Sequence, residues 1–377
     1  MDFSLSEEQQ LLKDSIEKFV SSDYDFEARR DLVNSDLGYS EAHWNMFAEL
    51  GWLGMGFSEE DGGYGGSASD IMVIMQAFGK GLVIEPFLAN CILAGGAISE
   101  LASASQKDSL LASIIGGEQQ MALAYAEKQA RYNIANCLSR AEKNGDGYVL
   151  NGAKIAVLNG GNADTILVLA RTSGDQNDKA GLSLFAVPSN TEGLERARYT
   201  TVDGFTGADI KLSNVSLPAS ALVGEEGAAF EALERVMDRA CIAVCAEALG
   251  NMETLLIKTV EYSKTRKQFG FTLSFFQALQ HRMAEMFIEC QQAQSMLLMA
   301  AMKFDASAED ASTAVSAAKA RIGQAAKRVG QEAVQLHGGM GVTDELDVGH
   351  YFKRLTIIDA LFGNSDYHLK RYTAAMG

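Results

Sequence analysis

Residues 147–170 read GYVLNGAKIAVLNGGNADTILVLA, and short apolar segments in this stretch alternate with turn-forming residues. A period of two over such short segments predicts β-strands. The chain repeats this pattern at 148–150, 154–158, 165–170, 182–187 and 209–212. Sequences rich in Asn, Asp and Gly predict turns at 144–147, 151–152, 159–162 and 173–178. Because no helix-length pattern separates the strands, we expect an antiparallel sandwich or barrel rather than a parallel dinucleotide-binding sheet.

Helical patterns flank this β segment on both sides. They occupy 40–50 and 68–79 before it, and 230–265, 275–304 and 311–336 after it. Near the N-terminus, Ser6 followed by Gln9 predicts a capping box at the start of another helix. We therefore predict an α+β multidomain protein, with a helical domain at 1–118, a middle antiparallel β domain at 119–225 and a helical bundle at 226–377.

The charge of the chain restricts its partners. Its 32 Lys and Arg residues against 49 Asp and Glu residues give a net charge of −17, which argues against binding to nucleic acid or to an anionic membrane. A phosphate-bearing ligand would therefore need a local basic cluster. The five cysteines are scattered without a CxxC pair, and the five histidines lack metal-ligand spacing, so we expect neither disulfides nor a metal site.

The N-terminal sequence MDFSLSEEQQ lacks the basic and apolar regions of a secretory signal. The most apolar stretch, residues 71–98, is interrupted by Lys80, Glu85 and Pro86, which predicts buried helix ends and a turn rather than a membrane span. Together with the cysteine pattern, these features predict a cytoplasmic protein.

Five motifs, in this order along nearly the whole chain, resemble those of the acyl-CoA dehydrogenase family. They are EEDGGYGG at 59–66, LVGEEGAAF at 222–230, TRKQFG at 265–270, FQALQHRMAEM at 276–286 and QLHGGMG at 335–341. The resemblance implies the helical–β–helical fold of that family, FAD as cofactor and a role in fatty acid metabolism.

The same resemblance assigns a set of FAD-binding residues. In the family, the RxxFG and QxxGG motifs of one subunit contact the FAD of its neighbour, which implies a homo- or hetero-oligomer, a dimer or a tetramer. An arginine supplies planar, bidentate donors to a pyrophosphate, and glycines let the backbone approach a ligand closely. The predicted FAD-binding residues are Arg266, Gln268, Phe269, Gln277, Gln335, Gly338, Gly339 and Asn364.

The implied reaction is α,β-dehydrogenation of an acyl-CoA, in which a carboxylate removes the α-proton while the β-hydrogen leaves as hydride. Most family members place the glutamate base before a glycine in the last helical segment, where this chain has Phe362 before Gly363. A minority place it before an arginine early in the first bundle helix, where an ungapped count reaches Ala240. The nearest acidic residue followed by arginine is Asp238, so we predict Asp238 as the catalytic base and Arg239 as a substrate contact.

Two other carboxylates are alternatives to Asp238 as the base. Asp359 lies one helical turn before position 362, and Glu247 lies within CysAlaGluAlaLeuGly. An ordinary ion pair or interhelical polar contact is the structural alternative for each. The β domain departs from the family too, since only Glu127 remains of its Thr-Glu-Pro element and Leu158 replaces a flavin-bonding hydroxyl.

Three functions follow from this resemblance. The first is an FAD-dependent acyl-CoA dehydrogenase that passes electrons to an electron-transfer flavoprotein. Residues 79–87 and 351–363 resemble the smaller subunit of pimeloyl-CoA-type, two-subunit dehydrogenases. The second is a catalytically impaired assembly subunit of a heteromeric enzyme, which is suggested by Phe362, by Leu158 and by the missing Thr-Glu-Pro element. The third is an acyl-CoA oxidase. The sequence does not identify the acyl chain.

Overall fold

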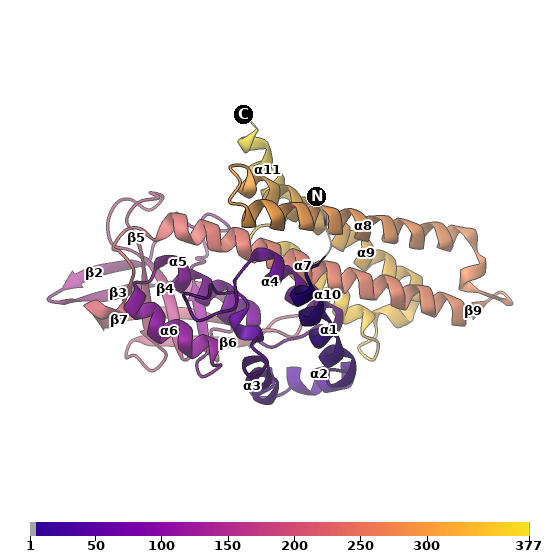
Figure 1. The fold of residues 1–377 in the computed structure, drawn as a ribbon, viewed down its shortest axis with the longest axis horizontal. Coiled ribbons are helices and arrows are strands. Elements are labelled where there is room, and N and C mark those ends of the chain that lie inside the picture. Colours follow the sequence, from indigo (N-terminus) through magenta and orange to yellow (C-terminus); the bar gives the residue numbers. More distant parts are fainter. Residues whose placement is uncertain (1–4, 377) are drawn as a thin grey trace. The chain divides into compact units, whose positions relative to one another are not determined.

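The computed structural model describes residues 5–376, which fold into two compact units (Figure 1). The first unit comprises the described parts of Met1–Asp31 and Cys241–Gly377 together with Ala68–Val83. The second unit comprises Leu32–Ser67 and Ile84–Ala240. Helix α7, Ala229–Thr265, begins in the second unit and ends in the first. The three consecutive domains that we predict from the sequence differ from these two units, and that division remains a proposal.

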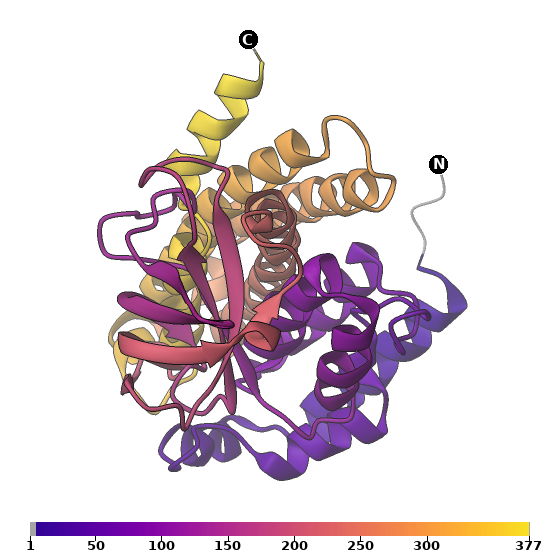
Figure 2. The same ribbon diagram turned by 90° about the vertical axis from the view of Figure 1, so that its left-hand side faces the viewer.

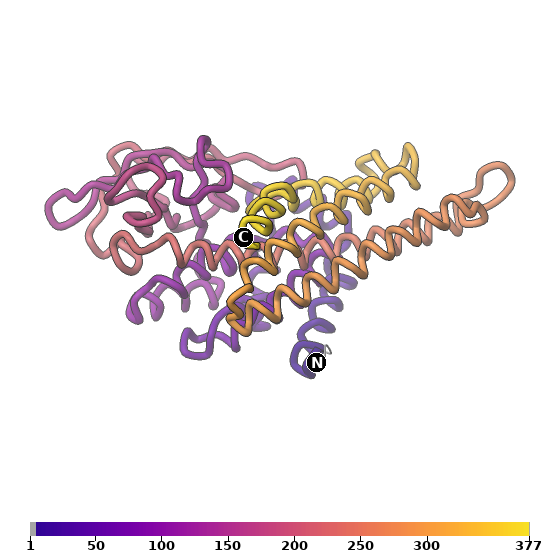
Figure 3. Tube along the Cα trace, turned by 90° about the horizontal axis from the view of Figure 1, so that it is seen from above, coloured from indigo at the N-terminus to yellow at the C-terminus, as the bar shows by residue number. Residues whose placement is uncertain are grey.

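The first unit is built from helices. They are α1 (Glu7–Ser22), α2 (Phe26–Val33, whose last two residues belong to the second unit), α4 (Ala68–Gly81), most of α7, α8 (Gln277–Asp305), α9 (Ala311–His337), α10 (Val348–Ala360) and α11 (Ser365–Ala375). The capping box at the start of α1 is present, since the side chains of Ser6 and Gln9 each accept from the other's backbone N–H. Helices α8 and α9 pack along each other, joined by the short turn after α8 (Figure 3).

Two glycines allow α4 and α7 to cross with their backbones in contact. A methyl group on Gly250 would lie 2.0 Å from the carbonyl oxygen of Gln76. A methyl group on Gly79 would lie 2.2 Å from the carbonyl oxygen of Glu247. Any larger residue at either position would force the helices apart, so this crossing fixes the positions of the α7 side chains relative to α4.

The described residues of the second unit form an eight-stranded sheet (Figure 2). Its strands run in the order β6-β7-β3-β2-β4-β5-β8, with β1 pairing with β4. Their bounds are β1 Met121–Ala124, β2 Arg140–Asn144, β3 Gly147–Leu158, β4 Thr165–Arg171, β5 Leu182–Pro188, β6 Leu194–Thr200, β7 Thr206–Pro218 and β8 Leu222–Val223. Inward side chains such as Leu150, Val168 and Phe185 form its core. Helices α3 (Glu41–Glu49), α5 (Gly96–Leu101) and α6 (Ala104–Ile115) belong to the same unit.

The sheet is mixed, although we expected it to be antiparallel. Strand β4 runs parallel to β1 and to the end of β2, whereas the other pairings are antiparallel. A β-hairpin lies between β1 and β4 in sequence, and this long connection permits the parallel pairing.

The turn predicted at Asn151-Gly152 is wrong, because both residues lie within the continuous strand β3. Asn151 pairs with Arg140 of β2, and its side-chain oxygen accepts from the backbone N–H of Asn214 at 2.8 Å. A methyl group on Gly152 would lie 2.3 Å from the hydroxyl oxygen of Ser139. The glycine therefore permits close approach of a neighbouring segment at a β-bulge, rather than a reversal of the chain.

Among the described residues, α7 is the one helix that could span a membrane by length and composition. The protein interior buries 78% of its most apolar window. An apolar helical segment that is buried in this way is typical of a protein core. All five cysteines are free and buried.

Candidate functional site

The predicted FAD-binding residues concentrate at one end of the helical unit. There α7 ends, a two-stranded hairpin follows, and α8 begins (Figure 3). The hairpin pairs β9 (Lys267–Gln268) with β10 (Phe271–Thr272). Its two turn residues, Phe269 and Gly270, have φ angles of 52° and 84°, as a tight β-hairpin turn of this kind requires.

A cavity of about 540 Å³ lies beside this hairpin, between the end of α7 and the end of α9. Five of the predicted residues line it: Arg266, Gln268, Gln335, Gly338 and Gly339. The first two come from the α7 end and the hairpin, and the last three come from α9 and the 3₁₀ turn Gly338–Val342. The fold thus brings together two motifs that are about 70 residues apart in the sequence.

The polar groups of this cavity are available to a ligand. Within residues 5–376, the guanidinium of Arg266 and the side-chain amides of Gln268 and Gln335 have no ion-pair or hydrogen-bond partner. A methyl group placed on Gly338 or Gly339 would meet nothing within 4 Å, so the backbone there faces open space. A guanidinium, two amides and accessible peptide groups fit an anionic, phosphate-bearing cofactor such as FAD.

Three other predicted FAD-binding residues lie outside the cavity lining. Phe269 is 89% exposed at the hairpin tip, and Gln277 is exposed at the first residue of α8. Asn364 caps α11, because its side-chain oxygen accepts from the backbone N–H of Tyr367 at 2.9 Å. This contact gives Asn364 a structural role within the chain, and FAD binding by these three residues remains a prediction.

Sequence reasoning missed an aromatic pair in the cavity wall. The rings of Tyr262 and His337 stack with their centroids 4.4 Å apart. Burial lowers the pKa of His337, whose Nδ1 donates to the carbonyl oxygen of Ala333 at 2.8 Å. In the neutral imidazole, which the lowered pKa favours, this bond leaves Nε2 as the acceptor. The position of Tyr262, one helical turn before Arg266, was the sequence signal for this wall.

The turn that carries the catalytic glutamate in most of the family is firmly held here. Phe362 occupies it with a φ of 58° and is nearly buried. The ammonium of Lys319 donates to the carbonyl oxygens of Ile358, Asp359 and Gly363 at 2.8–3.0 Å. His368 Nε2 lies 3.2 Å from the carbonyl oxygen of Phe362. The turn therefore keeps a fixed geometry around an apolar side chain.

The two alternative bases both have structural partners. An oxygen of Asp359 accepts from the backbone N–H and hydroxyl of Ser365, at 3.2 and 2.7 Å. The two oxygens of Glu247 accept from Arg354 at 2.5 and 2.7 Å, in a pair that is buried on both sides. Glu247 thus makes the interhelical contact that the sequence offered as the alternative to catalysis.

The predicted base and substrate contact lie near the start of α7, in the second unit. Asp238 is buried, with 6% of its surface exposed, and Ala240 is fully buried. Nη2 of Arg239 donates to the carbonyl oxygens of Gly56 and Gly66, the latter at 2.7 Å. Arg239 therefore anchors the glycine-rich loop of this unit, and its contact with substrate remains a prediction.

Glu127 of the β domain is the acceptor of a buried polar network. One oxygen accepts from the ammonium of Lys154 at 2.7 Å and from the hydroxyl of Ser139 at 2.7 Å. The other accepts from the backbone N–H of Leu138 and the amide of Gln129. Burial by itself would raise the pKa of Glu127. The positive charge of Lys154 and the hydrogen bonds donated by Lys154, Ser139 and Gln129 outweigh burial and lower the pKa to about 2.

This network predicts a specific acid sensitivity. The pKa of Glu127 is about 2 in the folded chain against an ordinary value of 4.5, so the network stabilises the fold above pH 4.5. We expect that contribution, roughly 3 kcal/mol, to be lost as the pH falls from about 4.5 to 2. Lys154→Met should lower the free energy of unfolding at pH 7. It should also reduce the acid branch, that is, the loss of stability between about pH 4.5 and 2, as measured by urea unfolding across the pH range.

The matched control for this prediction is Lys211→Met, which removes a lysine from the exposed pair with Glu195 in the same sheet. It should change the free energy of unfolding by less than about 0.5 kcal/mol and leave the acid branch intact. An acid branch in Lys154→Met as steep as that of the unmodified protein would contradict this role of the pair.

Neither unit presents a metal centre in its described residues. No group of three or more His, Cys, Asp or Glu side chains among residues 5–376 could hold a metal ion. The cavity beside Arg266, with its unpaired guanidinium and side-chain amides, is suited to a charged cofactor by a different chemistry.

Three family models match consecutive parts of the chain. The N-terminal domain of acyl-CoA dehydrogenases matches residues 6–118, the middle domain matches 122–217, and the C-terminal domain matches 229–377. Together they account for most of the sequence, including both motifs of the cavity.

Individual proteins are similar over the same length. A short-chain-specific acyl-CoA dehydrogenase of Megasphaera elsdenii is 30% identical over 332 residues, which is 85% of each chain. The solved structure of an FAD complex of PigA has a TM-score of 0.92 and 27% identity, and covers 100% of this chain and 99% of that one. A chain of the ChsE4–ChsE5 complex of Mycobacterium tuberculosis has a TM-score of 0.89 and 25% identity, with the same coverage.

Proposed function

Because the chain belongs to the acyl-CoA dehydrogenase family, we propose that it oxidises an acyl-CoA thioester between Cα and Cβ and passes the electrons to an electron-transfer flavoprotein. The chain is an oxidoreductase of this family, and its cofactor is FAD, as in the related complex of PigA. FAD, when bound, supplies the acceptor for the hydride.

The observation that carries this proposal is the cavity with unpaired polar side chains beside the hairpin. Arg266 would hold the cofactor diphosphate through its guanidinium, and the open backbone at Gly338 and Gly339 would let its peptide groups approach the same ligand. Gln268 and Gln335 can each donate and accept a hydrogen bond there. In the family this surface serves the FAD of a neighbouring subunit, so we propose that the protein works as an oligomer.

The residue that we propose for proton removal is Asp238. A base must meet the substrate Cα in a site that excludes water, and the burial of Asp238 provides that exclusion on the protein side. The carboxylate would take the α-proton at one of its oxygens and hold it as the β-hydrogen leaves. Arg239 lies next to it and would contribute a fixed positive charge while it anchors the glycine-rich loop.

A second candidate function is supported by the turn at Phe362. Lys319 and His368 hold this turn in place, yet it presents an aromatic ring where most of the family has the base. A catalytically impaired subunit that assembles with an active paralogue would keep such a turn for structural reasons. The similarity to a chain of a two-protein complex is consistent with that reading. For either function we propose a cytoplasmic location and the three-domain division given above.

The visible spectrum of the purified protein tests the first function. We expect a yellow protein whose flavin bleaches when a pool of acyl-CoA thioesters is added under anaerobic conditions. Reoxidation by an electron-transfer flavoprotein, with little peroxide formed in air, would identify a dehydrogenase rather than an oxidase. A flavin that every acyl-CoA leaves oxidised, until a paralogous subunit is added, would favour the assembly subunit.

The same spectra test the cofactor cavity through two neighbouring cations. Arg266→Met should weaken FAD binding by about tenfold or more, because it removes a charge-assisted contact. Lys267→Met is the matched control, since Lys267 is exposed in β9 and does not line the cavity. Equal FAD retention by both variants would contradict the assignment of Arg266.

A further inference from the structure

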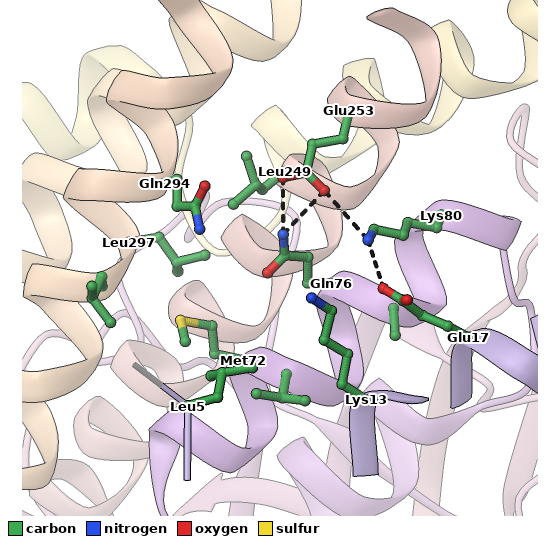
Figure 4. A pocket seen from close by; sticks show the side chains of 13 residues that line it. Leu5, Lys13, Glu17, Met72, Gln76, Lys80, Leu249, Glu253, Gln294 and Leu297 are labelled. Carbon is green, nitrogen blue, oxygen red and sulfur yellow. Dashed lines mark hydrogen bonds and ion pairs between the residues drawn. The ribbon is translucent and has the colours of Figure 1, made fainter. Parts of the chain in front are cut away.

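The helical unit contains another cavity, between α1, α4, α7 and α8, that is separate from the residues of the proposed reaction (Figure 4). Its volume is about 180 Å³. None of the residues that line it belongs to the FAD-binding set, to the turn at Phe362 or to the candidate bases. Its lining combines four charged side chains with an apolar wall.

Lys80 contacts both acidic side chains of the cavity. Its ammonium lies 2.6 Å from an oxygen of Glu17 and 3.7 Å from an oxygen of Glu253. The amide of Gln76 donates to both oxygens of Glu253 at 3.1 Å. These dashed contacts in Figure 4 join α1, α4 and α7, and they leave the four groups occupied with one another.

Two donors of the cavity are not occupied in this way. Over the described part of the chain, neither the ammonium of Lys13 nor the side-chain amide of Gln294 has an ion-pair or hydrogen-bond partner. The two positive charges of Lys13 and Lys80 balance the two negative charges of Glu17 and Glu253, so the charges of the lining sum to zero. The ammonium of Lys13 remains available to contact a ligand directly. An ammonium and an amide N–H that line one cavity can both donate to a single carboxylate.

The remaining wall is apolar, and its α4 and α7 sides are fixed relative to each other. Met72 of α4, Leu249 of α7 and Leu297 of α8 line it. Leu249 directly precedes Gly250, where α7 contacts the backbone of α4. Because that crossing cannot loosen without separating the helices, Met72 and Leu249 keep their relative positions, and together with Leu297 they offer an apolar surface to a short aliphatic chain.

We propose that this cavity binds a short aliphatic monocarboxylate of four or five carbons. Its carboxylate accepts from Lys13 and Gln294, and its methylene groups pack against Met72, Leu249 and Leu297. A volume of 180 Å³ corresponds to about six non-hydrogen atoms, taking roughly 30 Å³ for each as for water. Butanoate has six such atoms, whereas octanoate has ten.

Titration calorimetry with butanoate on the FAD-loaded protein tests this site. We expect a Kd on the order of 1 mM, since so small a ligand has few contacts to offer. Butanamide and octanoate should each bind at least about tenfold more weakly, the first for lack of charge and the second for lack of room. Lys13→Met should weaken butanoate binding about tenfold, and Gln294→Leu should weaken it by a smaller factor.

Lys18→Met is the matched control, because Lys18 is an exposed lysine of α1 that does not line the cavity. It should leave butanoate binding unchanged. Three results would overturn the proposal. They are the absence of binding at butanoate concentrations well above the expected Kd, binding of butanamide as tight as that of butanoate, and an unchanged Kd for butanoate in Lys13→Met. Loss of butanoate binding on saturation with an acyl-CoA would also overturn it, by locating the carboxylate in the substrate site.

Discussion

Arg354→Met is expected to lower the free energy of unfolding by about 3–5 kcal/mol, because it leaves the carboxylate of Glu247 buried without its counter-ion. The pair has nearly no exposure on either side, and its two short hydrogen bonds join α7 to α10. Because Glu247 is buried, water does not solvate its carboxylate in place of the lost guanidinium. Urea unfolding followed by circular dichroism measures the loss.

The double variant Glu247→Leu/Arg354→Met separates the charge effect from the packing effect. Replacing both partners by apolar residues removes the unpaired charge, so we expect the double variant to recover most of the lost stability. Lys353→Met is the matched control, since the contact of Lys353 with Asp344 is exposed, and it should change stability by less than about 0.5 kcal/mol. A double variant as unstable as Arg354→Met would contradict this account of the pair.

Asp238→Asn is expected to slow flavin reduction by an acyl-CoA by about 10²–10⁴-fold while FAD stays bound. Asparagine keeps the size and hydrogen-bonding capacity of the side chain but cannot accept the α-proton. Anaerobic stopped-flow absorbance at the flavin band measures the reduction, and the absorbance ratio of protein to flavin measures the FAD content.

Glu231→Gln is the matched control for this variant, because Glu231 is an exposed carboxylate in the first turn of the same helix. It should leave the reduction rate unchanged. Full activity of Asp238→Asn would exclude Asp238 as the base. The role would then pass to Asp359, tested by the corresponding asparagine variant, or to a partner subunit if that variant is active too.

Several helices and one helix cap could be predicted from the local sequence. The helices predicted at 68–79 and 311–336 are α4 and α9, each within two residues at either end, and the Ser6–Gln9 capping box is present. Such features depend on side-chain spacing along a single helix, which the sequence displays directly. The motif order was equally direct evidence for the family.

Strands with no alternating pattern escaped the sequence analysis. Six of the seven side chains of β6 are exposed and the seventh is half-buried, and β2 buries only Ala141. These strands exist because β7 and β3 offer them a hydrogen-bonding edge, as Asn151 shows for the pairing of β3 with β2. An edge of this kind is a property of the assembled sheet, so the sequence of the strand itself did not reveal it.

By itself the sequence determined the family, the order of the helical and β segments, and the two motifs that line the cavity proposed for FAD. Only the tertiary structure decided which charges meet. It paired Glu127 with Lys154 and Glu247 with Arg354, and it placed Lys319 against the turn at Phe362. Each of these contacts joins groups at least 27 residues apart in the chain. The burial that makes these contacts strong arises only when the elements pack together, so the local spacing of residues does not predict it.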